Sequence, residues 1–432
     1  MARQIHLGVF MLGTGNHFAG WRLPGAFDSF TTMDMTRSIA ATAERGRFDL
    51  IFLGDGYVAT PGTHPSWQSR AEPLTQLAAI AAMTTHVGLG GTASTTYSDP
   101  FTVARAFASL DHLSGGRAAW NIVTTGREAS GLHFGKAHPD HDRRYEIADE
   151  FHQVVCGLWD CWDDDAFVAD RESGVYVDWS KVRTLDHEGT YFQVKGPLNI
   201  ARAPQGHPVI LQAGGSAVGQ AFAAKTADIV FTVVGDYEDA RERYRSMRQA
   251  LAAAGRDADE VCIMPGVMPV VGRTDGEALD RLNELQTFIA DGRGLDMLSD
   301  RLGQDLRAYA MDDPVPDLPL PDTSHGFARA LLGRAKRERL KIRDLYNLTV
   351  AARGHYVLCG SPQTIADEFE KWFTGGAADG FNVMPTHFPQ GFDAFVDLVV
   401  PELQQRGLYR SDYTGPTLRD HLGIARPAVP AR

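Results

Sequence analysis

A Gly-Gly-Ser turn at residues 214–216 is one place in this sequence where residue type and spacing could do chemistry. The turn follows the apolar run Pro208–Gln212 and precedes a helical pattern that starts near Gly219. A turn that opens a helix presents backbone N–H groups and a hydroxyl, which is what a phosphate group requires. The same residues also suit a tight connection in which Ser216 only caps the helix. The turn alone leaves both interpretations open.

The segment from His138 to Tyr145 is a second candidate anion site. It places two imidazoles, two guanidinium groups and a phenol just before a helical pattern. These groups suit a phosphate, and they are equally typical of a solvated helix cap. The spacing His138-x-x-His141 also occurs in zinc sites, but zinc needs three or four ligands and no second His or Cys pair stands out. We therefore expect no metal.

Three polar residues follow or end predicted strands. Asp55 comes directly after an apolar run, Asn121 lies inside another, and His17 follows two glycines. Asp55 and Asn121 each fit a cofactor contact or a structural hydrogen bond. A histidine titrates near neutral pH, so His17 is a candidate acid/base, although a loop histidine exposed to solvent fits the same position.

Several common catalytic and nucleotide-binding signatures are absent. Residues 88–93 formally match G-x-G-x-x-A, but no helix pattern opens there and the expected acidic residue is missing from a strand end. A Rossmann nicotinamide site is thus disfavoured. The sequence has no Walker motif, G-x-S-x-G elbow or kinase motif set. It also has no lysine at a predicted strand end, which disfavours a Schiff-base aldolase.

Eight short apolar runs alternate with amphipathic helical patterns along the chain. This alternation predicts a (β/α)8 barrel, in which catalytic groups gather at the carboxyl ends of the strands. The predicted strands are Ile5–Phe10, Leu50–Leu53, Val87–Gly91, Ala118–Val123, Pro208–Gln212, Ile229–Val234, Cys262–Val267 and Phe381–Met384. The predicted helices are Met35–Arg47, Glu72–Thr84, Pro100–Leu113, Tyr145–Cys161, Gly219–Lys225, Tyr237–Ala254 and Pro362–Thr374.

Uneven spacing predicts two insertions in one barrel domain. We expect a single domain over residues 1–425, with insertions at about 163–206 and 274–358, and a tail at 426–432. The last thirty or so residues contain no further β/α period and form a C-terminal extension. We expect this extension to wrap the surface of the chain or a partner subunit.

Composition narrows the class of protein. The chain has 432 residues and a formal net charge of −12, which disfavours nucleic acid and anionic membranes as partners. No run of eighteen apolar residues occurs, and the start of the chain lacks a signal-peptide pattern. Four cysteines without a C-x-x-C pair indicate free thiols in a reducing compartment. We expect a soluble cytoplasmic protein.

Several long strings, in the same order, make the chain similar to a known family. The strings are Ser109–Thr124, His141–Phe151, Gly375–Pro385, Asp397–Gly407 and Thr417–Gly423. Together they resemble the nitrilotriacetate monooxygenase, pristinamycin IIA synthase and dibenzothiophene-sulfone monooxygenase family. That family belongs to the FMN-dependent branch of the bacterial-luciferase-like barrels. The resemblance covers roughly residues 3–424.

The resemblance implies a cofactor and a site. It implies that FMN binds in the reduced form, FMNH2, and that a flavin (hydro)peroxide formed with O2 transfers one oxygen atom to a small organic substrate. Oxygen is expected at a carbon next to nitrogen or sulfur, or at the heteroatom. The implied cofactor residues are Asp55, Thr92, Ser94 and Asn121 around the ring and ribityl chain, and His141, Tyr145, Gly215 and Ser216 around the phosphate.

Acid/base and substrate residues are less sharply indicated. His17 is our candidate acid/base near the oxygen, with Tyr57 and His325 as further pocket residues. Thr124 and Thr125 stand where alkane-oxidising relatives carry a histidine, which disfavours alkane oxidation. Arg22 is the only positively charged residue in a segment that we expect to contact the substrate. We therefore expect a neutral or singly charged substrate.

The resemblance also implies partners. Since no nicotinamide motif is present, a separate NAD(P)H:FMN reductase should supply FMNH2, and the chain should form a homodimer or homotetramer. Two alternatives remain: a deazaflavin-dependent oxidoreductase on the same barrel, and a non-catalytic flavin-binding protein.

Overall fold

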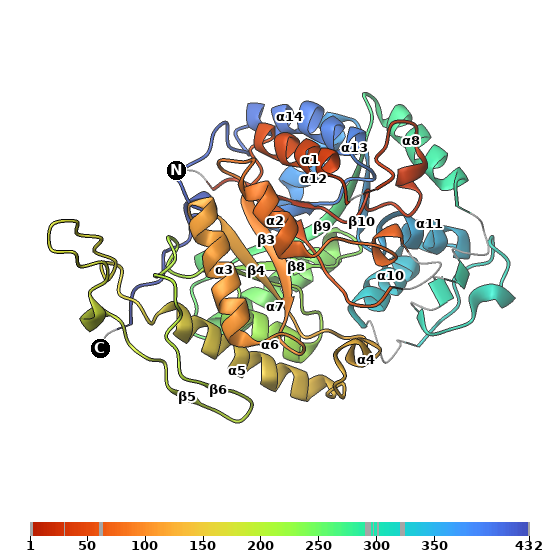
Figure 1. Cartoon of the computed structure of the whole chain (residues 1–432). Helices are drawn as coiled ribbons and strands as arrows, with labels where there is room; N and C mark the ends of the chain where they lie inside the picture. The colour runs from red at the N-terminus through yellow and green to blue at the C-terminus, as the bar shows by residue number, and fades with distance from the viewer. Residues whose placement is uncertain are drawn as a thin grey trace.

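Parallel strands close into a barrel at the centre of the computed structural model (Figure 1). Eight strands close in the order β1-β2-β3-β4-β7-β8-β9-β11, because β9 pairs with β8 through Cys262–Pro265 and with β11 through Gly266 and Val267. The structure describes residues 3–29, 31–59, 64–289, 295–296, 298–299, 302–319 and 325–430, without the side chains of 325–327, 330 and 350. The barrel strands are β1 (His6–Phe10), β2 (Leu50–Leu53), β3 (Gly88–Ser94), β4 (Ala118–Val123), β7 (Val209–Gln212), β8 (Ile229–Thr232), β9 (Cys262–Val271) and β11 (Gly380–Val383).

The predicted barrel is confirmed, with one strand that the sequence analysis did not predict. Strand β10 (Tyr356–Gly360) pairs with the second half of β9, through Val267–Val271, and extends the sheet beyond the closed barrel. A short antiparallel hairpin, β5 (His187–Glu188) and β6 (Gln193–Val194), forms in the segment expected to be the first insertion. The hairpin lies within the first expected insertion, and β10 begins inside the second and extends past its expected end at about residue 358. The domain boundaries themselves stay a prediction.

Helices surround the barrel, and local sequence explains their ends. Helix α3 (Pro100–Ser114) begins with Asp99, whose side chain accepts from the Thr102 N–H, and with proline at its first position. It ends at Gly115, which has a left-handed φ of 71° that favours glycine. The other helices are α1 (Met33–Arg45), α2 (Pro73–Ala81), α4 (Ser130–Phe134), α5 (His141–Trp159), α6 (Ala217–Thr226), α7 (Tyr237–Ala253), α8 (Asp275–Thr287), α10 (His325–Glu338), α11 (Ile342–Ala352), α12 (Pro362–Thr374), α13 (Gln390–Ala394), α14 (Val400–Gln405) and α15 (Leu418–Leu422), with a π-helical turn at Phe395–Val399. In the part of the chain described, no helix is long and apolar enough to cross a membrane.

Aromatic side chains fill the barrel interior. Phe10 stacks on Phe52 with ring centroids 4.9 Å apart, and Phe231 lies 5.9 Å from each of them. Leu418 and Leu422 of α15 belong to the same buried cluster, so the C-terminal extension closes the end of the barrel where the strands begin. Open space therefore has to lie at the opposite end, where the strands stop.

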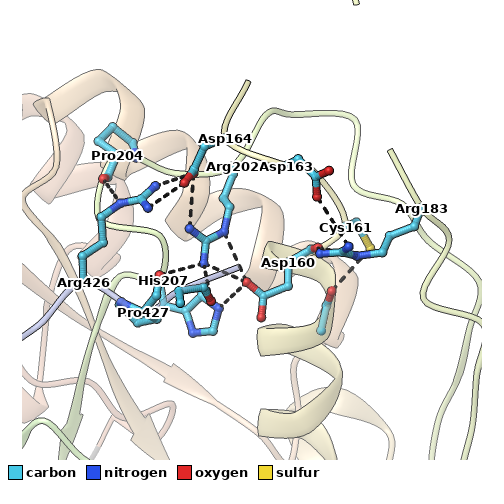
Figure 2. A network of polar contacts seen from close by, with 12 residues as sticks. Asp160, Cys161, Asp163, Asp164, Arg183, Arg202, Pro204, His207, Arg426 and Pro427 are labelled. Carbon is cyan, nitrogen blue, oxygen red and sulfur yellow. Dashed lines mark hydrogen bonds and ion pairs between the residues drawn. The ribbon is translucent and has the colours of Figure 1, made fainter. Parts of the chain in front are cut away.

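A network of ion pairs fixes the C-terminal tail to the segment after α5 (Figure 2). Arg426 donates to both oxygens of Asp164 at 2.8 and 2.5 Å. Arg202, whose side chain is 1% exposed, pairs with Asp160 at 3.0 Å and Asp164 at 3.3 Å, and it donates to the carbonyl oxygen of Pro427 at 3.0 Å. The extension thus wraps the chain's own surface, as one of the two sequence-based alternatives predicted.

Replacing the buried guanidinium should destabilise the fold. In Arg202→Met, Asp160 and Asp164 lose their buried cation but keep His207 and Arg426 as partners, so we expect the free energy of unfolding to fall by about 2 kcal/mol. Arg37→Met is the control, because the Arg37–Asp34 pair is largely exposed and should contribute less than about 1 kcal/mol. Urea denaturation of both variants checks this, and equal effects would contradict it.

Candidate functional site

A cavity of about 280 Å³ opens at the carboxyl ends of the barrel strands. Its walls combine apolar and aromatic side chains with hydroxyl, amide and charged groups, a mixture typical of small-molecule sites. The lining residues are Asp55, Gly56, Tyr57, Val58, Trp67, Thr92, Ile122, Val123, Thr124, Thr125, Gly126, Arg127, Ser130, Tyr145, Gln212, Ala213 and Gly214. Thus β3, β4 and β7 supply the floor, and the loops that follow the strands supply the walls.

Hydrogen bonds link the polar floor across neighbouring strands. The Thr92 hydroxyl donates to the Leu53 carbonyl oxygen at 2.8 Å, and Asn121 Nδ2 donates to Thr92 Oγ1 at 2.8 Å. On the next strand, Gln212 Nε2 donates to the Ile122 carbonyl oxygen at 2.6 Å. These bonds use one hydrogen of each amide nitrogen. Asn121 lies behind Thr92 and does not line the cavity itself, and its Oδ1 is buried with no partner among the described residues.

Two titratable groups on the cavity wall have raised pKa values. Burial raises the pKa of Asp55, although the Gly56 N–H and Arg70, 3.5 Å from the carboxylate, act in the opposite direction. Burial also raises the pKa of Tyr57, and the nearby Asp55 charge adds to this effect. The Tyr57 ring packs edge-on against Phe134 at 4.8 Å. Both groups can therefore carry a proton inside the cavity above their usual pH range.

The start of α6 forms one end of the cavity. Ser216 caps this helix by accepting from the Gly219 N–H at 3.1 Å, and Gly214 lines the cavity. A Cβ on Gly219 would lie 2.6 Å from the Tyr145 hydroxyl, so glycine permits Tyr145 to approach the turn. Unpaired N–H groups and the positive end of the helix dipole favour an anion here.

Other expected cofactor residues lie near this end or behind the wall. Gly215 is exposed beside the lining residue Gly214. His141 is exposed, pairs with Asp142 at 2.8 Å, and has its ring 5.2 Å from that of Tyr145. Ser94 is fully buried and does not line the cavity, but it contacts the lining residue Thr125 at 2.7 Å between hydroxyl oxygens.

His17 does not line the cavity. It is 1% exposed, and its Nδ1 accepts from the Ala19 N–H at 3.1 Å, which puts the neutral ring's proton on Nε2. Burial lowers the pKa of His17 to about 3, although the Gln286 side chain acts in the opposite direction. The ring is therefore neutral near pH 7. Its assignment as acid/base stays a prediction.

His325 is the first residue of α10, and its side chain lies outside the described residues. Its role likewise stays a prediction.

A second cavity of about 290 Å³ lies beside the second half of β9 and the loop after β11. His387 and Arg281 are among its lining residues, and burial lowers the pKa of His387 to about 4, with Arg281 adding to the effect. None of the expected cofactor residues lines this cavity.

Sequence analysis did not single out several lining residues, among them Gln212, Trp67 and Arg127. Gln212 ends a predicted strand, so its position gave a usable signal. Trp67 and Arg127 gave none, because Trp67 ends a short 3-10 helix at Pro65–Trp67 and Arg127 lies on the loop after β4, and the course of both segments depends on tertiary contacts. Arg127 lies over the Trp67 ring, 5.2 Å from its centroid.

The described residues contain no group of three or more His, Cys, Asp or Glu side chains that could hold a metal ion. Both ring nitrogens of His138 are engaged, by the Tyr97 hydroxyl at 2.6 Å and by Arg144 at 2.8 Å.

Comparisons with known proteins agree with this architecture. Residues 10–379 match the family model described as luciferase-like monooxygenase. The chain is 46% identical to N-acetyl-S-(2-succino)cysteine monooxygenase of Bacillus subtilis (strain 168), over 98% of each chain. It is 42% identical to nitrilotriacetate monooxygenase component A of Aminobacter aminovorans, over 98% of this chain and 97% of that one.

Among solved structures, the chain is similar to a riboflavin lyase described with modified FMN and the substrate riboflavin. The TM-score is 0.84 at 32% identity, over 98% of this chain and 96% of that one.

The buried, neutral His17 should make stability depend on pH. In the unfolded chain the pKa of His17 is near 6.5, whereas in the folded chain it is about 3, so the folded ring stays neutral over this range. The free energy of unfolding should therefore fall as pH drops from about 6.5, by up to ~1.4 kcal/mol per pH unit from this group. His17→Gln can still accept from Ala19 but cannot titrate. Urea denaturation between pH 7 and 4.5 should give a shallower slope for the variant, and equal slopes would contradict the assignment.

Proposed function

The chain belongs to the luciferase-like monooxygenase family, and from that premise we propose that it is the oxygenase component of a two-component, FMNH2-dependent monooxygenase. In the overall reaction, one atom of O2 enters a small organic substrate and the other leaves as water. The observation that carries this proposal is the cavity at the ends of β3, β4 and β7, which joins a polar floor to the start of α6.

The residues present fit FMN. The start of α6, with Ser216 and Gly215, and the phenol of Tyr145 suit a phosphate, with His141 beside them. Thr92 at the floor and Asp55 at the wall suit the polar edge of the ring, and Asn121 holds the Thr92 hydroxyl from behind the floor. Ser94 acts through Thr125. When bound, reduced FMN supplies the electrons that activate O2.

Residues of the chain itself have to keep water away from the reacting atoms and hold the proton that the reaction needs. Tyr57, Trp67 and Val58 give the cavity an apolar side, which limits water around the reacting atoms. Tyr57 lines the cavity and its raised pKa keeps the hydroxyl protonated near neutral pH. We assign Tyr57 the role of holding a proton at its hydroxyl oxygen, available to the bound oxygen species.

Partners follow from the same assignment. One similar protein is named component A, which supports a multicomponent system. We infer that a separate NAD(P)H:FMN reductase delivers FMNH2 to this chain. Homodimer or homotetramer formation and a cytoplasmic location are part of the same proposal.

Titration with FMNH2 tests the function. Under anaerobic conditions, the purified protein should bind FMNH2, and mixing with oxygenated buffer should change the flavin absorbance more slowly than in free solution. Ser216→Ala removes the cap at the phosphate end, so it should weaken FMNH2 binding by about tenfold and leave binding of reduced riboflavin unchanged.

Two outcomes would contradict the proposal. Failure to bind FMNH2, together with binding of a reduced deazaflavin, would favour the deazaflavin alternative. Equal losses for FMNH2 and reduced riboflavin in Ser216→Ala would remove Ser216 from the phosphate site. Thr102→Ala, at an exposed position of α3, serves as a control that should bind both flavins like the wild type.

Cavity charge supports a neutral or singly charged substrate. Asp55 and Arg127 are the acidic and basic side chains among the described lining residues, so the wall offers one cation to an anionic substrate. A tricarboxylate would bring two further buried charges without partners. With FMNH2 and O2, a thioether monocarboxylate should therefore be oxidised faster than nitrilotriacetate, as judged by product mass. Faster turnover of nitrilotriacetate would overturn this substrate class.

A further inference from the structure

His138 lies in the loop between α4 and α5, and both of its ring nitrogens have partners. Nη1 of Arg144 lies 2.8 Å from Nε2, and the Tyr97 hydroxyl oxygen lies 2.6 Å from Nδ1. A guanidinium only donates hydrogen bonds, so Nε2 must accept and cannot carry hydrogen. The remaining proton of the neutral ring is then on Nδ1, which donates it to the Tyr97 hydroxyl oxygen. These two contacts therefore fix a single tautomer of His138.

The groups around this imidazole keep it neutral near pH 7. Burial lowers the pKa of His138 and the Arg144 charge adds to this effect, while Glu128 acts in the opposite direction. Arg144 is itself held in place, because it is 8% exposed and its Nη1 also donates to the Pro139 carbonyl oxygen at 2.8 Å. A protonated ring would set its own N–H against the N–H of Arg144, so the bond to Arg144 requires the neutral ring.

Aromatic rings connect Tyr97 to the wall of the first cavity. The Tyr97 ring stacks on Phe134 with centroids 4.7 Å apart and an interplanar angle of 7°. The Tyr57 ring meets both of them edge-on, 4.8 Å from Phe134 and 6.2 Å from Tyr97. Gly131 lets α4 lie close to Tyr97, because a Cβ there would be 3.2 Å from the Tyr97 hydroxyl oxygen. Tyr57, which lines the cavity, therefore packs against two rings, one of which is held by His138.

We propose that His138 is a positioning residue for Tyr57: its Nδ1–H fixes the Tyr97 ring, Phe134 stacks on that ring, and the two rings together hold Tyr57 at the cavity wall. The inference rests on the proposed function, which assigns Tyr57 the role of holding a proton. His138 itself is not a lining residue of the cavity. Because both of its nitrogens are used, it offers no lone pair to a metal and no N–H to a phosphate.

Nitrogen NMR of the protein without flavin, labelled with isotope-enriched histidine, tests the tautomer. The His138 signals are identified by their loss in His138→Gln. At pH 7 they should show hydrogen on Nδ1 and none on Nε2, because Nε2 accepts from Arg144. Hydrogen on Nε2 at this pH would contradict the bond from Arg144 and overturn the proposal.

Fluorine NMR of the same protein, labelled with fluorotyrosine, tests the positioning. The Tyr57 signal is the one that is lost in Tyr57→Phe. His138→Leu removes the donor, and Tyr97→Phe keeps the ring but removes the acceptor, so each should shift and broaden the Tyr57 signal. His138→Gln offers one acceptor and one donor, as the imidazole does, and should retain the wild-type signal. An unchanged Tyr57 signal in folded His138→Leu and Tyr97→Phe would overturn the proposal.

A matched control uses the other histidine of this region. His133 lies on α4, is exposed, and has no hydrogen-bond partner among the described residues. His133→Leu should therefore leave the Tyr57 signal as it is in the wild type. A change as large as that in His138→Leu would mean that the signal responds to the loss of any nearby imidazole, and it would overturn the assignment to His138.

A double-mutant cycle connects the positioning to the reaction. With FMNH2, O2 and the thioether monocarboxylate, Tyr57→Phe and His138→Leu should each slow product formation by about tenfold or more, and His138→Leu should leave the Kd for FMNH2 unchanged. Since His138 acts through Tyr57, the double variant should be no slower than Tyr57→Phe alone, and additive losses would overturn the proposal. A wild-type protein that binds no FMNH2 would instead refute the proposed function and leave both NMR results standing, so the two failures are distinguishable.

Discussion

Closure of one barrel end by the C-terminal extension is the constraint on which the rest of the structure depends. Arg419 of α15 pairs with Asp228 at 3.0 Å, and Arg410 contacts the fully buried carboxylate of Asp49, both where strands begin. Burial alone would raise the pKa of Asp49, but Arg410 and His6 outweigh it and hold the pKa below its usual value. With this end sealed and phenylalanines filling the interior, a ligand site has to lie where the strands stop.

At that edge, the floor of the cavity suits the FMN ring, and the wall at the start of α6 suits the FMN phosphate. Strands β3, β4 and β7 hold the Thr92 hydroxyl and the Gln212 amide through bonds to backbone carbonyl oxygens, and the Asn121 amide through its bond to the Thr92 hydroxyl oxygen. The start of α6 supplies N–H groups and a dipole for the phosphate. A polar floor and an apolar wall together suit a planar ring with polar edges.

Sequence patterns predicted the barrel well, because every barrel strand is a short apolar run followed by a turn. They did not predict β10, since eight strands already satisfied the pattern and Tyr356–Gly360 begins inside the expected insertion at about 274–358. Among site residues, Asp55, Tyr57, Thr92 and Tyr145 line the cavity, because strand ends and helix starts fix their direction. His17 does not line it, because its ring is buried away from the cavity, where it accepts from the Ala19 N–H. Trp67 and Arg127 depend on loop contacts that no local pattern encodes.

A crystal structure of the protein with FMN, reduced with dithionite under anaerobic conditions, tests the central claim most directly. The account predicts that the ring lies in the cavity lined by Thr92, Ile122 and Gln212, and that the phosphate lies at Ser216 and Tyr145. Flavin density in the second cavity, beside Arg281 and His387, would contradict it.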